Sequence, residues 1–192
     1  MDNINKIKDF FDTLASTWDD KNADAQGAKK IVKQFKSQIK DKDLLDVGCG
    51  TGVLYEPLNE AGLKSYTGID VSEEMIKIAK ENHKSENFIC DDLLQWETDR
   101  KFDTIIMYNV YPHLTDKQKL VDKVYSLLKT SGVFIVAHGS SKETINSHHT
   151  SHAMEVSRKL MKAEEEAEIW RNNFNIYIIR DNELYYFSGE KI

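Results

Sequence analysis

The chain has little of what marks secreted, membrane-spanning or nucleic-acid-binding proteins. Only two cysteines occur, Cys49 and Cys90, which is too few for a disulfide framework and is typical of reduced thiols. No apolar run approaches the ~18 residues that span a bilayer, and the polar, amphipathic start of the chain is unlike a signal peptide. The formal net charge of −6 argues against binding by neutralisation of phosphates. We therefore expect a soluble cytoplasmic protein with no nucleic-acid or membrane partner.

The length of 192 residues and the hydrophobic content of 40% suit a single globular domain. A chain of this size buries roughly two-thirds to three-quarters of its unfolded surface, which is enough for one core. No internal repeat, low-complexity tract or linker divides it. We expect one domain over residues 1–192, and the sequence indicates no particular oligomeric state.

The stretch Asp43–Leu54 organises the rest of the chain. A short apolar run of the kind that forms a buried parallel strand leads into an acid and three alternate glycines, and the residues up to Ala61 read as helix. Glycines allow positive φ and let a ligand approach main-chain N–H groups that a Cβ would shield. This strand, tight loop and helix start predict a binding loop.

The spacing of the glycines narrows the choice of ligand. No lysine stands in the loop, which argues against a nucleoside-triphosphate P-loop, and Val53 stands where a dinucleotide fingerprint needs its last glycine. A glycine turn that merely joins strand and helix is an alternative, which the acid before the glycines disfavours. The run Leu45–Gly52 resembles the first motif of the class I S-adenosylmethionine-dependent methyltransferases. The resemblance implies that S-adenosylmethionine is bound by residues of this motif, namely Asp46, Gly48, Cys49 and Gly50.

A second strand, Ser65–Ile69, leads to Asp70, eighteen residues past Gly52. A βαβ unit needs about 20 residues to bring its second strand end beside the first, so this acid is expected to face the ligand. Its carboxylate can accept hydrogen bonds from both hydroxyls of a ribose, and Val71 can lie against adenine. Helix capping is the alternative role for Asp70, but Ser72 already provides that cap.

A third strand runs from Asn87 into the paired acids Asp91 and Asp92. In the family that the chain resembles, an acid at this strand end accepts the adenine amino group, and the next backbone N–H meets a ring nitrogen. The resemblance thus implies that Asp92 and Leu93 bind adenine, with Asp91 close enough to share the role. A solvated acidic pair in a turn is the alternative.

The fourth strand, Phe102–Tyr108, leads into Asn109, which we assign to the cofactor site. The methyl acceptor is expected nearby, because ligands of open α/β sheets gather beyond the carboxyl ends of the strands. Amino-methylating DNA enzymes carry Asn or Asp, two prolines and an aromatic residue at this place. Here Val110 and Tyr111 separate Asn109 from a single proline, so a nucleobase acceptor is disfavoured. Tyr108 and Tyr111 are candidates for cation–π contact with the sulfonium.

Histidines gather around the fifth strand, which is expected over Val133–Ala137. A neutral imidazole can take a proton from an oxygen or nitrogen nucleophile near neutral pH. The candidate catalytic bases are His113, His138 and His149. On a helix, three further side chains would share a face that a transition metal can use, but no cysteine or fourth ligand accompanies them, so we expect no metal. These are His148, His152 and Glu155. Surface histidines with no chemistry are the third interpretation.

Helical patterns flank this core. Asn3–Trp18 and a Lys-rich helix that ends near Ile39 carry apolar stripes, and Asp19–Asp24 between them is polar enough for a hinge. In the family that the chain resembles, such N-terminal helices, here within residues 1–40, cover the cofactor site and help form the substrate pocket. Ordinary core packing is the alternative role for their aromatic residues.

The later elements follow from turn and cap signals. Thr115 and Gln118 predict a capping box for a helix that ends at Ser131–Gly132. Met154–Asn172 reads as a charged helix whose Glu164–Glu166 run is solvated. After it, Phe174–Ile179 and Leu184–Phe187 alternate around an Asp-Asn turn and predict a β-hairpin.

These elements predict an α/β fold over residues 43–192, a doubly wound and mostly parallel seven-stranded sheet that closes with an antiparallel hairpin, as the methyltransferase resemblance implies. The predicted function is transfer of a methyl group from S-adenosylmethionine to a small-molecule acceptor by in-line displacement. Alignment of the reactants and exclusion of water are then the main tasks of the protein, and a base is needed only for a protonated acceptor. The alternatives are a non-catalytic S-adenosylmethionine-binding protein and an NAD-dependent oxidoreductase.

Overall fold

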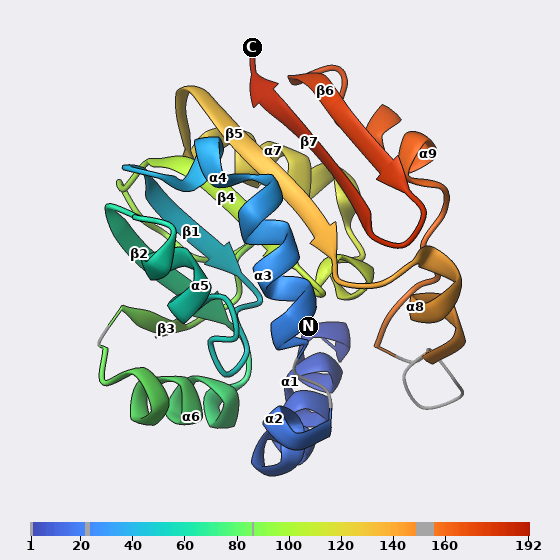
Figure 1. Ribbon diagram of the computed structural model, residues 1–192. Coiled ribbons are helices and arrows are strands. Elements are labelled where there is room, and N and C mark those ends of the chain that lie inside the picture. Colours follow the sequence, from blue (N-terminus) through green and yellow to red (C-terminus); the bar gives the residue numbers. More distant parts are fainter. Residues whose placement is uncertain (1, 22–23, 86, 149–155) are drawn as a thin grey trace.

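The computed structural model describes residues 2–21, 24–85, 87–148 and 156–192. Within them, seven strands form one sheet in the order β3-β2-β1-β4-β5-β7-β6 (Figure 1). The strands are β1 (Asp43–Val47), β2 (Ser65–Asp70), β3 (Phe88–Cys90), β4 (Phe102–Tyr108), β5 (Leu128–His138), β6 (Phe174–Asp181) and β7 (Tyr185–Lys191). Strands β1 to β5 pair in parallel with one another, whereas β7 pairs antiparallel with both β5 and β6. The predicted sheet and its C-terminal hairpin are confirmed.

The strand order reverses beside β1, and the register there sets the place of the site. The chain moves outward from β1 through β2 to β3 and then returns to the other side of β1 as β4. Val47 pairs with both Ile69 and Met107, so the residues that follow them leave the sheet at the same level. A crevice beyond the carboxyl ends of the strands at such a switch point is where α/β sheets bind ligands.

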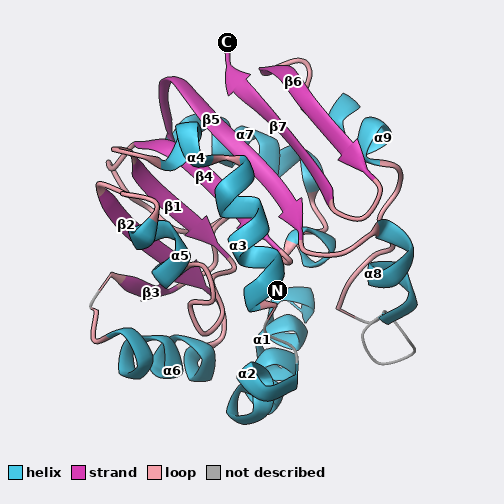
Figure 2. Cartoon of the chain, in the orientation of Figure 1, coloured by secondary structure: helices cyan, strands magenta, loops and turns pink. Residues whose placement is uncertain are grey.

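Helices cover both faces of the sheet (Figure 2). They are α1 (Asp2–Leu14), η1 (Ala15–Thr17), α2 (Trp18–Lys21), α3 (Ala25–Gln34), α4 (Lys36–Ile39), α5 (Tyr55–Glu60), α6 (Glu73–His83), η2 (Tyr111–His113), α7 (Lys117–Leu127), α8 (Lys142–His148) and α9 (Ala163–Glu168). One core cluster joins the sheet to α3, α5 and α6, and the other joins it to α7 and α9. Helix α1 instead lies beyond the carboxyl ends of the central strands (Figure 1). No helix of the described ranges is long and apolar enough to cross a membrane.

Three boundaries differ from the sequence prediction. The N-terminal helix ends at Leu14, and a 3-10 turn and the short α2 complete the stretch to Lys21. The helix expected to end at Ser131–Gly132 already ends at Leu127, because β5 begins at Leu128 and continues through those two residues. Asp116, rather than Thr115, caps this helix, since its side chain accepts a hydrogen bond from the Lys119 amide at 3.2 Å.

The charged segment before the hairpin also differs. Within its described part, residues 156–172, only Ala163–Glu168 forms a helix, α9. Glu164 and Glu165 are exposed as predicted, but Glu166 is 0% exposed. The prediction that the whole run is solvated was wrong for Glu166, because the helix turns this side chain inward to meet Arg158.

Candidate active site

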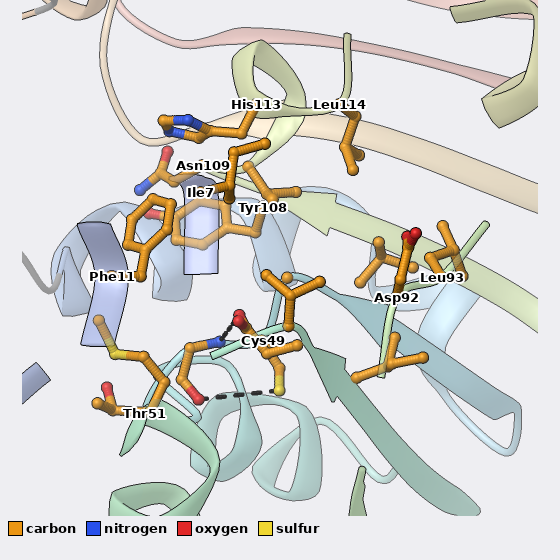
Figure 3. Close-up of a pocket in the computed structure, with 18 of the residues that line it drawn as sticks. Ile7, Phe11, Cys49, Thr51, Asp92, Leu93, Tyr108, Asn109, His113 and Leu114 are labelled. Atoms are coloured by element: carbon orange, nitrogen blue, oxygen red, sulfur yellow. Dashed lines mark hydrogen bonds between the residues drawn. The ribbon is translucent and has the colours of Figure 1, made fainter. Parts of the chain in front are cut away.

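A cleft opens at the carboxyl ends of β1, β2 and β4 and has an empty volume of about 940 Å³, counting the part that is open to solvent. Its lining includes Gly48, Cys49, Gly50, Asp70, Val71, Asp91, Asp92, Leu93, Asn109 and His113. These are ten of the residues that the sequence assigned to cofactor binding or catalysis. His113 and Leu114 lie at one end of the cleft, and Cys49 and Thr51 lie at the opposite end (Figure 3). The fold therefore brings the predicted motifs together.

The glycine loop after β1 forms the floor of the cleft. The amides of Gly48 and Cys49 both donate to the carbonyl of Ile69, at 2.8 and 3.2 Å, which folds the loop back onto β2. Gly48 has a φ of +67°, and a Cβ placed there would meet Val110 Cγ2 at 2.2 Å. Glycine is therefore required at this position both by the backbone conformation and by the space.

Asp70 links the second strand to this loop. One carboxylate oxygen accepts from the Gly50 amide and the other from the Ser72 amide, each at 2.9 Å. Burial raises the pKa of Asp70, and the bonds from these amides oppose that rise. A carboxylate offers about four lone-pair sites, so two remain for a ligand. Ser72 caps α6 as predicted, through a bond from the Met75 amide.

Asp46 lies beneath the loop and is not among the described residues that line the cleft. It is 2% exposed and accepts a hydrogen bond from the Tyr66 hydroxyl at 2.9 Å. Burial raises the pKa of Asp46 to about 7, and the nearby Asp70 carboxylate adds to the rise. The expected direct contact of Asp46 with a ligand is not supported, because the parallel strand points this side chain into the protein.

The third and fourth strand ends supply the other predicted residues. Asp91 is exposed and accepts from the Asp92 amide at 2.8 Å, and Asp92 accepts from the Leu94 amide at 3.0 Å. The two acids thus form a turn at the rim of the cleft, while Leu93 is buried beside them. Asn109 adopts a φ of +56°, and its side-chain oxygen accepts from the Gly139 amide at 3.2 Å.

The N-terminal segment closes one side of the cleft with Ile4, Ile7, Phe11 and Trp18. Asp12 of α1 accepts bonds from the Ser72 hydroxyl at 2.6 Å and from the Glu74 amide at 3.2 Å, so the cover is tied to the start of α6. Asp19 accepts from the Thr51 hydroxyl at 2.5 Å. The aromatic side chains Phe11 and Trp18 are therefore cleft walls rather than ordinary core.

Asp24 and Tyr108 form a further polar group of the cleft that the motifs did not single out as a pair. The Tyr108 hydroxyl donates to the side chain and to the carbonyl of Asp24, both at 3.0 Å. Burial and the Asp24 carboxylate raise the pKa of Tyr108. No local signal reveals this pairing, because the two residues lie 84 positions apart.

The three candidate bases differ in their position relative to the cleft. His113 lines the cleft, its Nδ1 lies 2.9 Å from the carbonyl oxygen of Val156, and its ring meets the Phe11 ring edge-on at 5.0 Å. His138 is 2% exposed, packs against Tyr185 and is not among the described residues of the cleft lining, so its position does not suit a base there. His149 lies outside the described residues.

The remaining side-chain predictions concern a metal and the tyrosines. In the parts of the chain that the structure describes, no group of three or more His, Cys, Asp or Glu side chains is placed to hold a metal ion. The alternative that His148, His152 and Glu155 share a metal-binding face cannot be examined, since His152 and Glu155 lie outside those parts. Tyr108 lines the cleft, whereas Tyr111 is 0% exposed and lies behind it. Cys49 and Cys90 are both free thiols.

Residues 39–186 match the model of a family described as a methyltransferase domain. Ubiquinone biosynthesis O-methyltransferases from Actinobacillus pleuropneumoniae serotype 5b and Pelagibacter ubique are each 30% identical to the chain, over 152 and 159 residues. These alignments cover 69% and 71% of the chain, which spans 64% and 66% of the length of those relatives.

Solved structures have the same fold. Magnesium protoporphyrin IX methyltransferase from Synechocystis PCC 6803 with bound SAH superposes with a TM-score of 0.72 at 20% identity, covering 97% of this chain and 98% of that one. The N-methyltransferase NodS from Bradyrhizobium japonicum WM9 in complex with SAH gives a TM-score of 0.68 at 18% identity, covering 91% and 90%. From the family match over residues 39–186 and the seven-stranded sheet, the chain belongs to the class I methyltransferase domain family.

Proposed function

We propose that this protein transfers a methyl group from S-adenosylmethionine to an oxygen atom of a small-molecule acceptor. The observation that carries the proposal is the convergence of the glycine loop, Asp70 and the Asp91–Leu93 turn on one cleft. The names of the curated relatives support oxygen as the acceptor atom. The two free cysteines support a cytoplasmic location.

The cleft residues fit an adenosyl group. Asp70 keeps lone pairs for two ribose hydroxyls after its bonds to Gly50 and Ser72. Val71 and Leu93 offer apolar surface for a flat base, with Asp92 beside them to accept from its amino group. At the other end of the floor, a Cβ added to Gly50 would meet nothing closer than 4.0 Å, so the backbone is open to a close approach.

Asp24 is the proposed counter-ion for the positive charge of the donor. It lines the same cleft, and the Gly27 amide holds its carboxylate at 2.8 Å while the Tyr108 hydroxyl holds it at 3.0 Å. A carboxylate fixed in this way needs no reorganisation to meet an ammonium or sulfonium group.

When bound, the donor supplies a methyl group already activated by the positive sulfur. The residues of the chain then align the acceptor and exclude water. Ile4, Ile7, Phe11 and Leu114 give the acceptor end an apolar wall, which suits a small acceptor with an apolar body. The polar residues at this end of the cleft, Asn109 and His113, suit an acceptor with a single hydroxyl group.

His113 is the proposed general base. Because a carbonyl oxygen only accepts hydrogen bonds, the 2.9 Å contact with Val156 places a proton on Nδ1. The lone pair of the neutral ring is then on Nε2, which can receive the proton of an acceptor hydroxyl. His149 stays a prediction from the sequence.

The test is calorimetry with S-adenosylhomocysteine and with NAD, followed by incubation with methyl-labelled donor and a panel of phenols and other small hydroxyl compounds. We expect tight binding of S-adenosylhomocysteine and transfer of label to a subset of the panel. Binding without transfer to the panel or to a small-molecule cell extract would favour a non-catalytic binding protein. Tight binding of NAD alone would overturn the proposal in favour of an oxidoreductase.

The role of His113 is tested by His113→Asn. General-base catalysis typically contributes roughly 10²- to 10⁴-fold, so kcat should fall by that range while the Kd for S-adenosylhomocysteine stays unchanged. Full activity of the variant would remove His113 from the chemistry.

A further inference from the structure

We propose that Arg158 and the buried Glu166 form a clamp that positions His113, so that these two residues set the protonation form and the direction of the imidazole without entering the cleft. This inference rests on the proposed function, in which His113 is the base. Neither clamp residue is among the described residues that line the cleft. They are therefore positioning residues rather than catalytic ones.

The first observation is the way in which Glu166 is buried. Its side chain is 0% exposed, and its oxygens accept from Arg158 Nη2 at 2.5 Å, from the Met161 amide at 3.1 Å and from the Tyr111 hydroxyl at 3.2 Å. A charge taken out of water is costly unless a partner and hydrogen bonds compensate for the lost hydration. This carboxylate has such partners, which fixes Arg158 and the segment around it in one place.

The segment around Arg158 lies against η2, which carries His113. The Arg158 amide donates to the Pro112 carbonyl at 3.0 Å, and two residues earlier the Val156 carbonyl meets His113 Nδ1 at 2.9 Å. Residues 156–158 thus contact η2 at the two positions that hold the histidine. The clamp and the base are joined through a stretch of three residues.

Tyr111 connects the same parts on the buried side. Its hydroxyl donates to Glu166 and accepts from Trp170 Nε1 at 3.3 Å, and its ring lies 5.7 Å from the Arg158 guanidinium. Lys117 Nζ lies 3.4 Å from the centre of this ring and donates to the Tyr111 carbonyl at 2.6 Å. Tyr111, the first residue of η2, is therefore held by contacts with both Glu166 and Lys117, and His113 is two residues further along.

The consequence is a single orientation of the imidazole. The Val156 carbonyl can hold the proton on Nδ1 only while residues 156–158 stay against η2. If the clamp is released, the ring can rotate or exchange tautomers, and the lone pair no longer points to one place. A misplacement of about 1 Å at a reacting group can cost roughly a hundredfold in rate.

The decisive variant is Glu166→Gln, which keeps the size of the side chain and removes its charge. The matched control is Glu164→Gln two residues earlier, where an exposed glutamate pairs with Arg171 at 2.9 Å. We expect kcat to fall between roughly tenfold and a hundredfold in Glu166→Gln, with less than a twofold change in the Kd for S-adenosylhomocysteine. The control should match the wild type in both.

A direct readout is the ¹⁵N NMR spectrum of the His113 ring, assigned by its loss in His113→Asn. The wild type should show one tautomer with the proton on Nδ1, and Glu166→Gln should show a mixture or the other tautomer. Arg158→Lys keeps a positive charge but loses the planar fork, so it should give the same direction of change and serves if Glu166→Gln does not fold.

Wild-type kcat together with an unchanged His113 tautomer in either folded variant would overturn the clamp. The NMR measurement needs no substrate, so it separates two failures. If the wild-type protein transfers no methyl group, the proposed function fails, while the tautomer in the variants still decides whether the clamp positions His113.

Discussion

Removal of the Asp70 carboxylate is the sharpest single test of the cleft as an adenosyl site. In the folded chain this carboxylate is held by the amides of Gly50 and Ser72, each at 2.9 Å, and faces the cleft between the first two strand ends. We expect Asp70→Ala to weaken binding of S-adenosylhomocysteine at least tenfold.

The magnitude follows from the bonds that the variant cannot make. A hydrogen bond to a charged group contributes about 1.5–3 kcal/mol, and each 1.4 kcal/mol is about a tenfold change in Kd. The loss of one ribose bond therefore gives about 10-fold to 150-fold weaker binding, and the loss of two gives more. Release of the glycine loop adds to the effect, since Gly50 loses its partner.

Isothermal titration calorimetry with S-adenosylhomocysteine is the assay, after circular dichroism has shown that the variant is folded. Asp122→Ala is the matched control, because this aspartate is exposed on α7 and pairs only with Gln118 among the hydrogen bonds of the described residues. It should bind like the wild type. An unchanged affinity in folded Asp70→Ala would refute the assignment of this residue to the site.

Three further predictions concern stability and the loop. Gly48→Ala should lower the melting temperature and abolish tight cofactor binding. A positive φ costs a residue with a side chain about 1–2 kcal/mol, and the new Cβ would lie 2.2 Å from Val110 Cγ2. A melting temperature equal to that of the wild type would contradict this prediction. The pKa of Asp46 is raised from 3.8 to about 7 on folding, so the native state keeps a proton that the unfolded chain releases. The protonated Asp46 therefore contributes fully to the free energy of unfolding below pH 4, and this contribution is lost as the pH rises to 7. The total loss is on the order of 4 kcal/mol, at 1.36 kcal/mol per pH unit of pKa shift. Urea denaturation of the apo protein between pH 5 and 7 should show a smaller loss in Asp46→Asn, and an equal loss would exclude the burial argument. Asp12→Ala should reduce the free energy of unfolding by about 1 kcal/mol, as for a lost helix cap. The reason is that Asp12 accepts hydrogen bonds from the Ser72 hydroxyl and from the Glu74 amide at the start of α6. An unchanged urea denaturation curve would show that these two bonds contribute nothing to stability.

The local chemistry of the glycine motif was enough to predict the binding loop and its place in the fold. Alternate glycines after a buried apolar run allow one kind of turn, and the distance from Gly52 to Asp70 fits one βαβ unit. Turn residues likewise indicated the C-terminal hairpin, which pairs as β6 and β7. Such features depend on neighbours in the chain, and the structure confirms them.

Other features depend on residues that are distant in the sequence. The pairs of Glu166 with Arg158 and of Asp24 with Tyr108 have no local signature, since an acidic residue in a polar segment looks the same whether it is solvated or paired with a distant residue. The same holds for the histidines. Their residue type suggested three candidate bases, and it is the path of η2 in the folded chain that brings His113 into the cleft.

The sequence by itself determined the glycine loop, the acids at the strand ends and the succession of strands and helices along the chain, because each follows from backbone preferences over a few residues or from the length of one α/β unit. The tertiary structure alone decided that Asp46 lies beneath the loop rather than in the cleft, that the aromatic residues of α1 form a wall of the site rather than ordinary core, and that Glu166 is buried against Arg158. Those outcomes depend on which faces of distant elements pack together, and packing is fixed only when the whole core forms.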